Sequence, residues 1–182
     1  MRYLWTARRQ THHSRLRGTN SVIEINILIT GHQWKWHYEY LEDEVGFFSN
    51  LSTSQEQIDG DVPKGEFYLR EVDEPLVIPT NTRVRFLITG NDVIHSWWVP
   101  DFAVKQDAIP GFINTAWTNV PEPGIFRGAC TELCGIKHAF MPVVVRAVER
   151  DEFDAFIAEK VALAEEERLL TSKVWTKDEL ME

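Results

Sequence analysis

The sequence predicts an all-β domain, a sandwich or barrel of short strands, followed by one C-terminal helix. Between residues 22 and 148, short runs of β-branched and aromatic residues alternate with turns rich in Pro, Gly, Asn and Asp. From Asp151 onward, apolar residues instead recur at helical spacing, and two acidic residues open the segment, as suits a helix N-terminus.

The strands are expected in quick succession. Val22–Thr30 and Gln33–Tyr40 come first, with Gly31 between them. Residues 42–65 mix Asp, Glu, Ser, Gly and Pro, and we expect a long surface loop there. The later strands are expected at Glu66–Val72, Leu76–Ile78, Arg83–Thr89, His95–Val99, Phe112–Val120, Gly124–Cys130 and Pro142–Val148.

This pattern divides the chain into four parts. Residues 1–20 form a polar lead-in, residues 21–150 the β domain, residues 151–170 the helix, and residues 171–182 a linker-like tail. No apolar run is long enough to span a bilayer, and no signal peptide is recognisable. We therefore expect the given polypeptide to be soluble. We also expect its Arg-rich start to flank a membrane segment that is missing from this sequence.

The net charge of the chain limits the classes of partner that it can bind. The formal net charge is −9, although residues 1–20 contain five Arg and no acidic residue. An acidic domain repels nucleic acid phosphates, so we expect no nucleic acid partner. The same charge suits a basic protein partner, and solubility alone remains the alternative explanation.

The segment from Cys130 to Pro142 contains four soft or borderline metal ligands, namely Cys130, Cys134, His138 and Met141. A disulfide between the two cysteines and a zinc site are the competing interpretations. The methionine favours copper, for which a weak axial thioether is common. No Cys-x-x-Cys-His motif occurs, so we expect no covalent haem in this chain.

The number of metal ions depends on a second histidine. One mononuclear blue-copper ion uses a single Cys, whereas two thiolates that bridge two ions require one further His. His95, at a strand start after the Asn91-Asp92 turn, is the candidate, although a lone His is more often structural. A binuclear copper centre, a mononuclear copper carrier or chaperone, and a zinc-stabilised structural domain all remain open.

Several motifs together resemble subunit II of cytochrome c oxidase. They are Gly31-His32-Gln33-Trp34-x-Trp36, Tyr38-Glu39-Tyr40, His95-Ser96-Trp97, Lys105-x-Asp107-Ala108-Ile109-Pro110-Gly111 and Cys130-x-Glu132-x-Cys134-Gly135-x-x-His138-x-x-Met141-Pro142. The resemblance covers Val22–Val148, about 70% of the chain. It implies a cupredoxin-like Greek-key fold and an electron-transfer subunit of a terminal respiratory oxidase. Such a subunit accepts electrons from cytochrome c and passes them to the haem-containing catalytic subunit I, without itself reducing oxygen.

The resemblance also implies the ligands of a binuclear copper (CuA) centre. Cys130 and Cys134 would bridge two copper ions, and His95 and His138 would each bind one. Met141 and the backbone carbonyl of Glu132 would be the weak ligands. The Glu132 side chain would bind magnesium at the subunit boundary of the full complex.

The resemblance makes Trp34 the residue where electrons enter from cytochrome c; core packing is the alternative role for this indole. The sequence departs from the commonest family pattern at Lys35, which puts a charge beside the docking surface. Glu39, Asp73 and Asp92 match acidic positions that dock the lysine-rich face of cytochrome c, although each could simply be solvated.

Both ends of the chain also resemble family segments. Arg8–Ile25 is similar to the loop between two membrane helices, so we expect that the second helix is missing and that the domain lies on the extracytoplasmic, periplasmic side. Trp175–Glu182 is similar to a linker that leads, in some bacterial relatives, to a fused cytochrome c domain absent here.

Overall fold

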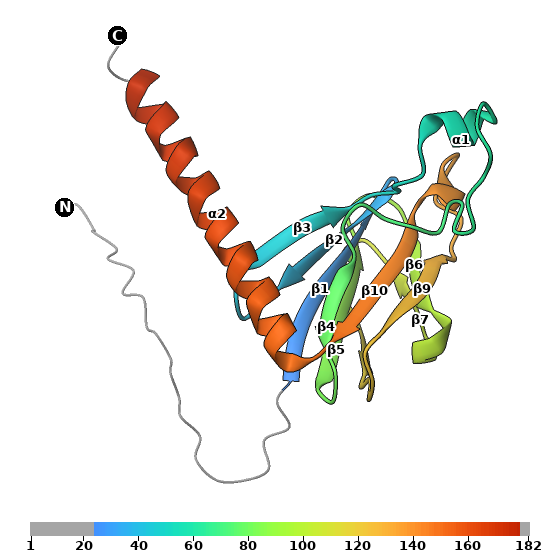
Figure 1. Ribbon diagram of the computed structural model, residues 1–182, viewed down its shortest axis with the longest axis horizontal. Helices are drawn as coiled ribbons and strands as arrows, with labels where there is room; N and C mark the ends of the chain where they lie inside the picture. The colour runs from blue at the N-terminus through green and yellow to red at the C-terminus, as the bar shows by residue number, and fades with distance from the viewer. Residues whose placement is uncertain (1–23, 179–182) are drawn as a thin grey trace.

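A computed structural model describes residues 24–178. Two five-stranded sheets pack face to face, and a long helix lies against one edge (Figure 1). The elements are β1 (Glu24–His32), β2 (Lys35–Tyr40), β3 (Val45–Ser49), α1 (Gln55–Asp59), β4 (Leu76–Pro79), β5 (Arg83–Gly90), β6 (His95–Val99), η1 (Pro100–Phe102), β7 (Val104–Ala108), β8 (Asn114–Thr118), β9 (Gly124–Cys130), η2 (His138–Phe140), β10 (Pro142–Val148) and α2 (Arg150–Asp178). This arrangement confirms the all-β prediction with a C-terminal helix.

The first sheet has the strand order β3-β2-β1-β5-β8. Strands β1 and β2 form a hairpin in which His32 pairs with Lys35, so only Gln33 and Trp34 lie in its turn. Side chains alternate between inside and outside along β2, which buries Trp36, Tyr38 and Tyr40. The hairpin therefore places its turn at one end of the sandwich (Figure 1).

The second sheet has the order β4-β10-β9-β6-β7. Strands β9 and β10 pair antiparallel, and Trp97 of β6 lies opposite Cys130 at the end of β9. The antiparallel pairing of β6 with β7 sets His95 opposite Ala108. These registers bring the start of β6 and the end of β9 to the same end of the sheet.

The two sheets are joined by a buried aromatic core. The Tyr40 hydroxyl donates to the carbonyl of Val77 at 2.7 Å and accepts from its N–H at 3.1 Å. Trp97 Nε1 donates to the Tyr38 hydroxyl at 3.4 Å. Because the buried hydroxyls of Tyr38 and Tyr40 each have a partner in the opposite sheet, these bonds fix how the sheets face each other.

The predicted strands differ from the observed ones at three places. Residues 42–65 contain β3 and α1 as well as loop, and Glu66–Val72 forms turns with only an isolated bridge, from Leu51 to Val72. Strand β7 was not predicted, because Lys105, Gln106 and Asp107 interrupt its apolar pattern. As an edge strand it has only one ladder partner in its sheet, β6, and tolerates these polar residues.

Helix α2 is longer than predicted. Phe153 and Ile157, one turn apart, are buried, and the Phe153 ring lies 6.0 Å from that of Tyr40. Lys160 forms an ion pair with Glu74 and lies 4.8 Å above the Phe47 ring. The helix continues to Asp178 and projects beyond the sheets, so residues 171–178, predicted as a linker, are helical (Figure 1). The predicted lead-in and residues 179–182 lie outside the described part of the chain.

Among residues 24–178, no helix combines the length and the apolarity needed to cross a bilayer.

Candidate metal centre

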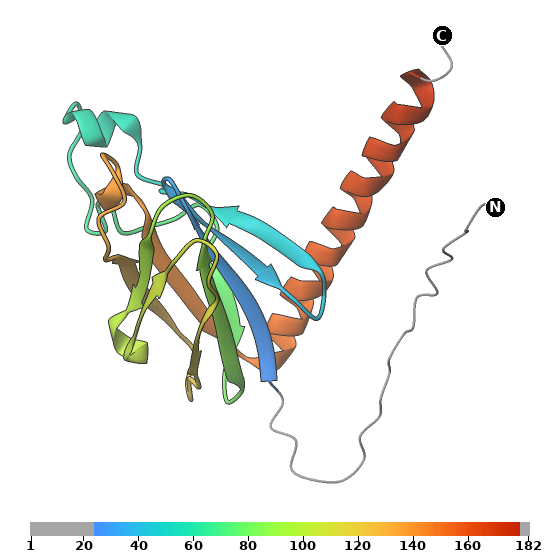
Figure 2. The ribbon, with the colours of Figure 1, turned by 180° about the vertical axis from the view of Figure 1, so that it is seen from behind.

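The ligand segment is a loop between two paired strands. Cys130 ends β9 and Met141 immediately precedes β10, and the Cys130 N–H donates to the Met141 carbonyl at 3.3 Å. Gly135 turns the loop with a φ of 118°, a conformation that favours glycine. The loop thus returns to its starting point and brings Met141 back beside the cysteines. Figure 2 gives the view from behind, with this loop and α1 at the same end of the molecule.

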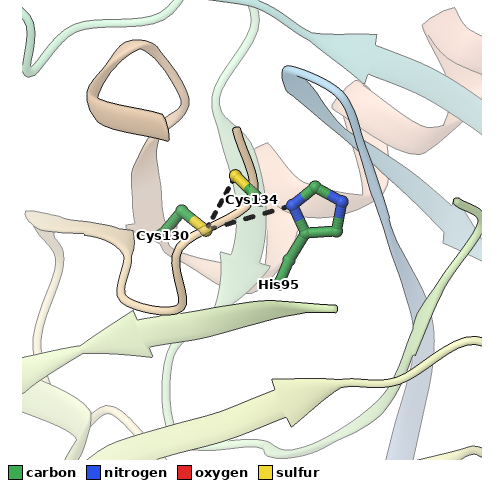
Figure 3. Close-up of side chains that lie close together, drawn as sticks. All are labelled: His95, Cys130 and Cys134. Carbon is green, nitrogen blue, oxygen red and sulfur yellow. Dashed lines mark hydrogen bonds between the residues drawn. The ribbon is translucent and has the colours of Figure 1, made fainter. Parts of the chain in front are cut away.

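His95 reaches the loop from the other side. Its side chain is fully buried, and Nδ1 lies 4.0 Å from the Cys130 sulfur (Figure 3). On the opposite edge of the ring, Nε2 lies 2.8 Å from Oδ1 of Asp92. A Cβ at Gly31 would lie 2.7 Å from the His95 ring, so only glycine leaves room for it.

The two sulfurs face each other at 3.8 Å (Figure 3). This separation is well beyond the roughly 2.05 Å of a disulfide, and both thiols are free. Cys130 Sγ lies 3.4 Å from the carbonyl oxygen of Glu132. Cys134 Sγ lies 3.5 Å from Nδ1 of His138 and 3.5 Å from the sulfur of Met141. Every copper ligand predicted from the sequence is therefore at this site.

Burial and hydrogen bonding give the two thiols different pKa values. Burial acts to raise the pKa of Cys130, but hydrogen bonds with His95 and with the backbone at Ser96 and Glu132 lower it to about 7. Burial and the neighbouring charge of Cys130 raise the pKa of Cys134 to about 12. Hydrogen bonds to Cys130 and Asp92 outweigh the burial of His95 and raise its pKa. In the metal-free protein, Cys130 is therefore the first thiol to lose its proton.

This geometry fits a metal ion bound by both thiolates. Two sulfurs at about 2.3 Å from one ion, with a tetrahedral angle between them, lie about 3.8 Å apart, which matches the observed 3.8 Å. The ligand atoms of His95, Cys130 and Cys134 all lie within 4.8 Å of one another. Soft sulfur ligands with imidazoles suit copper or zinc, and the thioether of Met141 favours copper.

Trp34 lies directly against the ligand loop. Its indole is half-buried, and Nε1 donates to the carbonyl of Cys134 at 3.2 Å. It is thus neither part of the central core nor a freely exposed ring, and it connects the surface to a ligand residue.

The three acidic residues predicted for docking differ in their surroundings. Asp92 belongs to the metal centre through His95, and Asp73 accepts hydrogen bonds from the backbone and side chain of Asn50. Glu39 lies on β2 opposite Leu28. A docking role for these residues stays a prediction.

Two residues of the site were missed as functional residues by sequence reasoning. The Gln33 side chain donates to the Cys134 carbonyl at 2.7 Å, and Trp36 Nε1 donates to the Met141 carbonyl at 3.4 Å. Both lie in the Gln33-Trp34-x-Trp36 motif, which was the available signal. Their contacts are with residues about a hundred positions away, so the sequence alone could not assign them.

Fold and site together define a cupredoxin-like domain, a β-sandwich with a cysteine-rich candidate metal site in the loop after its penultimate strand. The protein-family model for the periplasmic domain of cytochrome c oxidase subunit II matches residues 25–148 of this chain. The chain belongs to this family.

Named relatives agree with the match. The chain is 44% identical over 137 residues to a probable cytochrome c oxidase subunit 2 of Rickettsia felis, covering 75% of this chain and 42% of the relative. It is 46% identical over 132 residues to cytochrome c oxidase subunit 2 of Metridium senile, covering 71% and 51%. The chain therefore spans about half, or less, of these relatives.

Two solved structures share the fold. The periplasmic domain of oxidase subunit II from Bradyrhizobium japonicum is 38% identical, with a TM-score of 0.67 over 75% of this chain and 92% of that chain. A mixed disulfide between a thioredoxin-like protein and an oxidase subunit II domain matches with 37% identity and a TM-score of 0.63, over 76% of this chain and 91% of that chain. The predicted cupredoxin-like fold is thereby confirmed.

Proposed function

We propose that this chain is the electron-transfer domain of a terminal oxidase, with a binuclear copper centre that accepts electrons from cytochrome c. Copper held here would supply a one-electron couple. The residues proposed to hold it are His95, Cys130, Glu132 through its carbonyl, Cys134, His138 and Met141.

One observation carries the proposal of two ions rather than one. Each thiol has its own imidazole and its own weak ligand: Cys130 has His95 and the Glu132 carbonyl, and Cys134 has His138 and Met141. A single tetrahedral ion would need both imidazoles close to both sulfurs. His138 lies outside the group of ligand atoms that are all within 4.8 Å of one another, which supports two ions.

The position of Trp34 supports a path for electrons from the protein surface to the metal centre. Its indole lines a surface groove, and its N–H bonds to the Cys134 carbonyl, so a short path leads from the surface to a bridging sulfur. The proposed donor is cytochrome c, whose basic face suits the net charge of −9. A solved relative forms a mixed disulfide with a thioredoxin-like protein, which adds a protein of that class as a second proposed partner.

Exposed apolar side chains around the site support a large partner subunit. Ile94, Phe112, Leu133 and Ile136 are 45%, 68%, 78% and 89% exposed, on loops at the end of the sandwich that carries the metal centre. We assign this end to the contact with the catalytic subunit I at the periplasmic side of the membrane. The exposed Glu132 carboxylate would there complete a magnesium site in the full complex.

Metal analysis of the copper-loaded protein in its oxidised state tests the proposal, because a fully reduced pair of copper ions has no unpaired electron. Two copper ions per chain that share one unpaired electron, with the corresponding electron paramagnetic resonance spectrum, are expected. One copper per chain would point to a mononuclear carrier, and preferential zinc binding without a copper spectrum would point to a structural domain. Cys130→Ser and Cys134→Ser should each abolish the shared-electron spectrum.

A further inference from the structure

Gln33 contacts both halves of the metal centre. Its backbone N–H donates to Oδ2 of Asp92 at 2.8 Å, and its side-chain Nε2 donates to the carbonyl of Cys134 at 2.7 Å. Asp92 in turn contacts His95 through its other oxygen, at 2.8 Å. One residue of the β1–β2 turn thus joins the support of His95 to a bridging cysteine.

The two cysteines of the ligand loop are held differently. Cys130 is part of β9, where it pairs with Trp97 of β6, and the next residue, Thr131, donates its N–H to the Ser96 carbonyl at 3.0 Å. The Cys134 carbonyl instead accepts from two side chains of the hairpin turn, Gln33 and Trp34. The position of the second thiol therefore depends on side chains rather than on a strand ladder.

Gly135 brings the loop into contact with these side chains. A Cβ at this position would lie 3.0 Å from Gln33 Nε2 and 3.0 Å from Trp34 Cζ2. The loop therefore packs directly against the hairpin turn, and the Gln33 amide bonds to the Cys134 carbonyl although the residue is exposed overall.

We propose that Gln33 is a positioning residue that sets the separation of the two thiols. Its backbone N–H holds Asp92, which orients His95, and its side-chain amide holds the backbone of Cys134. Rigid support of ligands from outside the first coordination sphere preserves geometry and affinity at metal sites. This role rests on the proposed binuclear copper centre, but it concerns a residue that is not itself a ligand.

The test compares Gln33→Glu with Gln33→Ala in the full chain. Gln33→Glu keeps the length of the side chain but replaces the amide donor with a carboxylate that faces the Cys134 carbonyl. Gln33→Ala removes the side-chain hydrogen bond to the Cys134 carbonyl without adding charge. Both retain the backbone N–H that bonds to Asp92. We expect copper to dissociate about 10–100-fold faster in both variants, with changed copper hyperfine splitting and unchanged unfolding of the metal-free protein.

Gln55→Glu is the matched control. Gln55 lines the same groove as Gln33, and its side chain bonds to Asp59, away from the ligand loop. This variant adds the same charge at the same rim and should keep the wild-type spectrum and copper dissociation rate.

The outcomes separate the two proposals. If the wild-type protein binds two copper ions and both Gln33 variants match its spectrum and dissociation rate, the positioning role is wrong while the proposed function stands. If both variants unfold without metal, Gln33 serves the fold and the positioning role is also overturned. If the wild-type protein itself does not bind two copper ions, the proposed function fails first.

Discussion

The carboxylate of Asp92 lies 2.8 Å from Nε2 of His95, on the edge of the ring opposite the thiols. This contact leaves Nδ1 to face Cys130. Burial acts to raise the pKa of Asp92, but hydrogen bonds with His95 and with the backbone N–H groups of Gln33 and Val93 lower it. The carboxylate therefore stays ionised and orients the imidazole for metal binding.

Replacing this carboxylate should weaken the metal site. Asp92→Asn is expected to lower copper affinity about 10–100-fold, as measured by competition with a chelator. Asp73→Asn is the matched control, because Asp73 bonds only to Asn50 among the hydrogen bonds described. If Asp92 served only to dock a basic partner, Asp92→Asn would change the salt dependence of cytochrome c association and leave copper affinity intact.

Copper affinity should fall as the pH falls. Both thiols must lose their protons to bind metal, and in the metal-free protein their pKa values are about 7 for Cys130 and about 12 for Cys134. At alkaline pH Cys134 is the thiol that still has a proton to release, so affinity should fall roughly tenfold per pH unit as the pH is lowered. The fall should become steeper near and below pH 7, where Cys130 and His95, whose pKa is raised, are also protonated. Metal titrations between pH 6 and 8 measure this slope. A flat profile would contradict the assigned ligands.

Trp34→Phe should separate electron delivery from metal binding. Phenylalanine keeps an aromatic ring but loses the N–H that donates to the Cys134 carbonyl, which Gln33 still satisfies. We expect retained copper, a stability loss of about 1 kcal/mol and slower reduction by cytochrome c in stopped-flow experiments. Trp117→Phe is the control, because that indole is exposed on β8 and lies over Arg83. Equal slowing in both variants would remove the special role of Trp34.

Gly128→Ala should destabilise the fold beneath the site. A Cβ at Gly128 would lie 1.8 Å from the carbonyl oxygen of Trp98, so β6 and β9 could not keep their spacing. The expected loss is about 3 kcal/mol in urea unfolding of the metal-free protein. Gly65→Ala, where the nearest atom to the added Cβ is 3.8 Å away, should change stability by no more than about 0.5 kcal/mol. A loss below that level in Gly128→Ala would mean that the two strands separate without cost.

The two strands on either side of the ligand loop were predictable, because a turn with two prolines precedes β9 and a run of valines lies in β10. Strands β9 and β10 begin and end at the predicted residues, Gly124–Cys130 and Pro142–Val148. Strand β7 was not recognised, because polar residues on an edge strand weaken the pattern. Strand β3 was included in a predicted loop, because it is short, contains Gly46 and follows a run of acidic residues. The pairing of these two strands with β6 and β2 is decided by the neighbouring strands rather than by their own composition.

The sequence by itself determined which residues can bind metal, because residue type and spacing within one loop, Cys130 to Met141, specify the donor atoms. Only the tertiary structure decided how the separate parts meet. His95 lies 4.0 Å from a sulfur 35 positions away because β6 pairs with β9. Gln33 supports both sides because the β1–β2 turn packs on the loop. Such contacts depend on strand register and side-chain packing across the whole sandwich, which no local pattern of residues encodes.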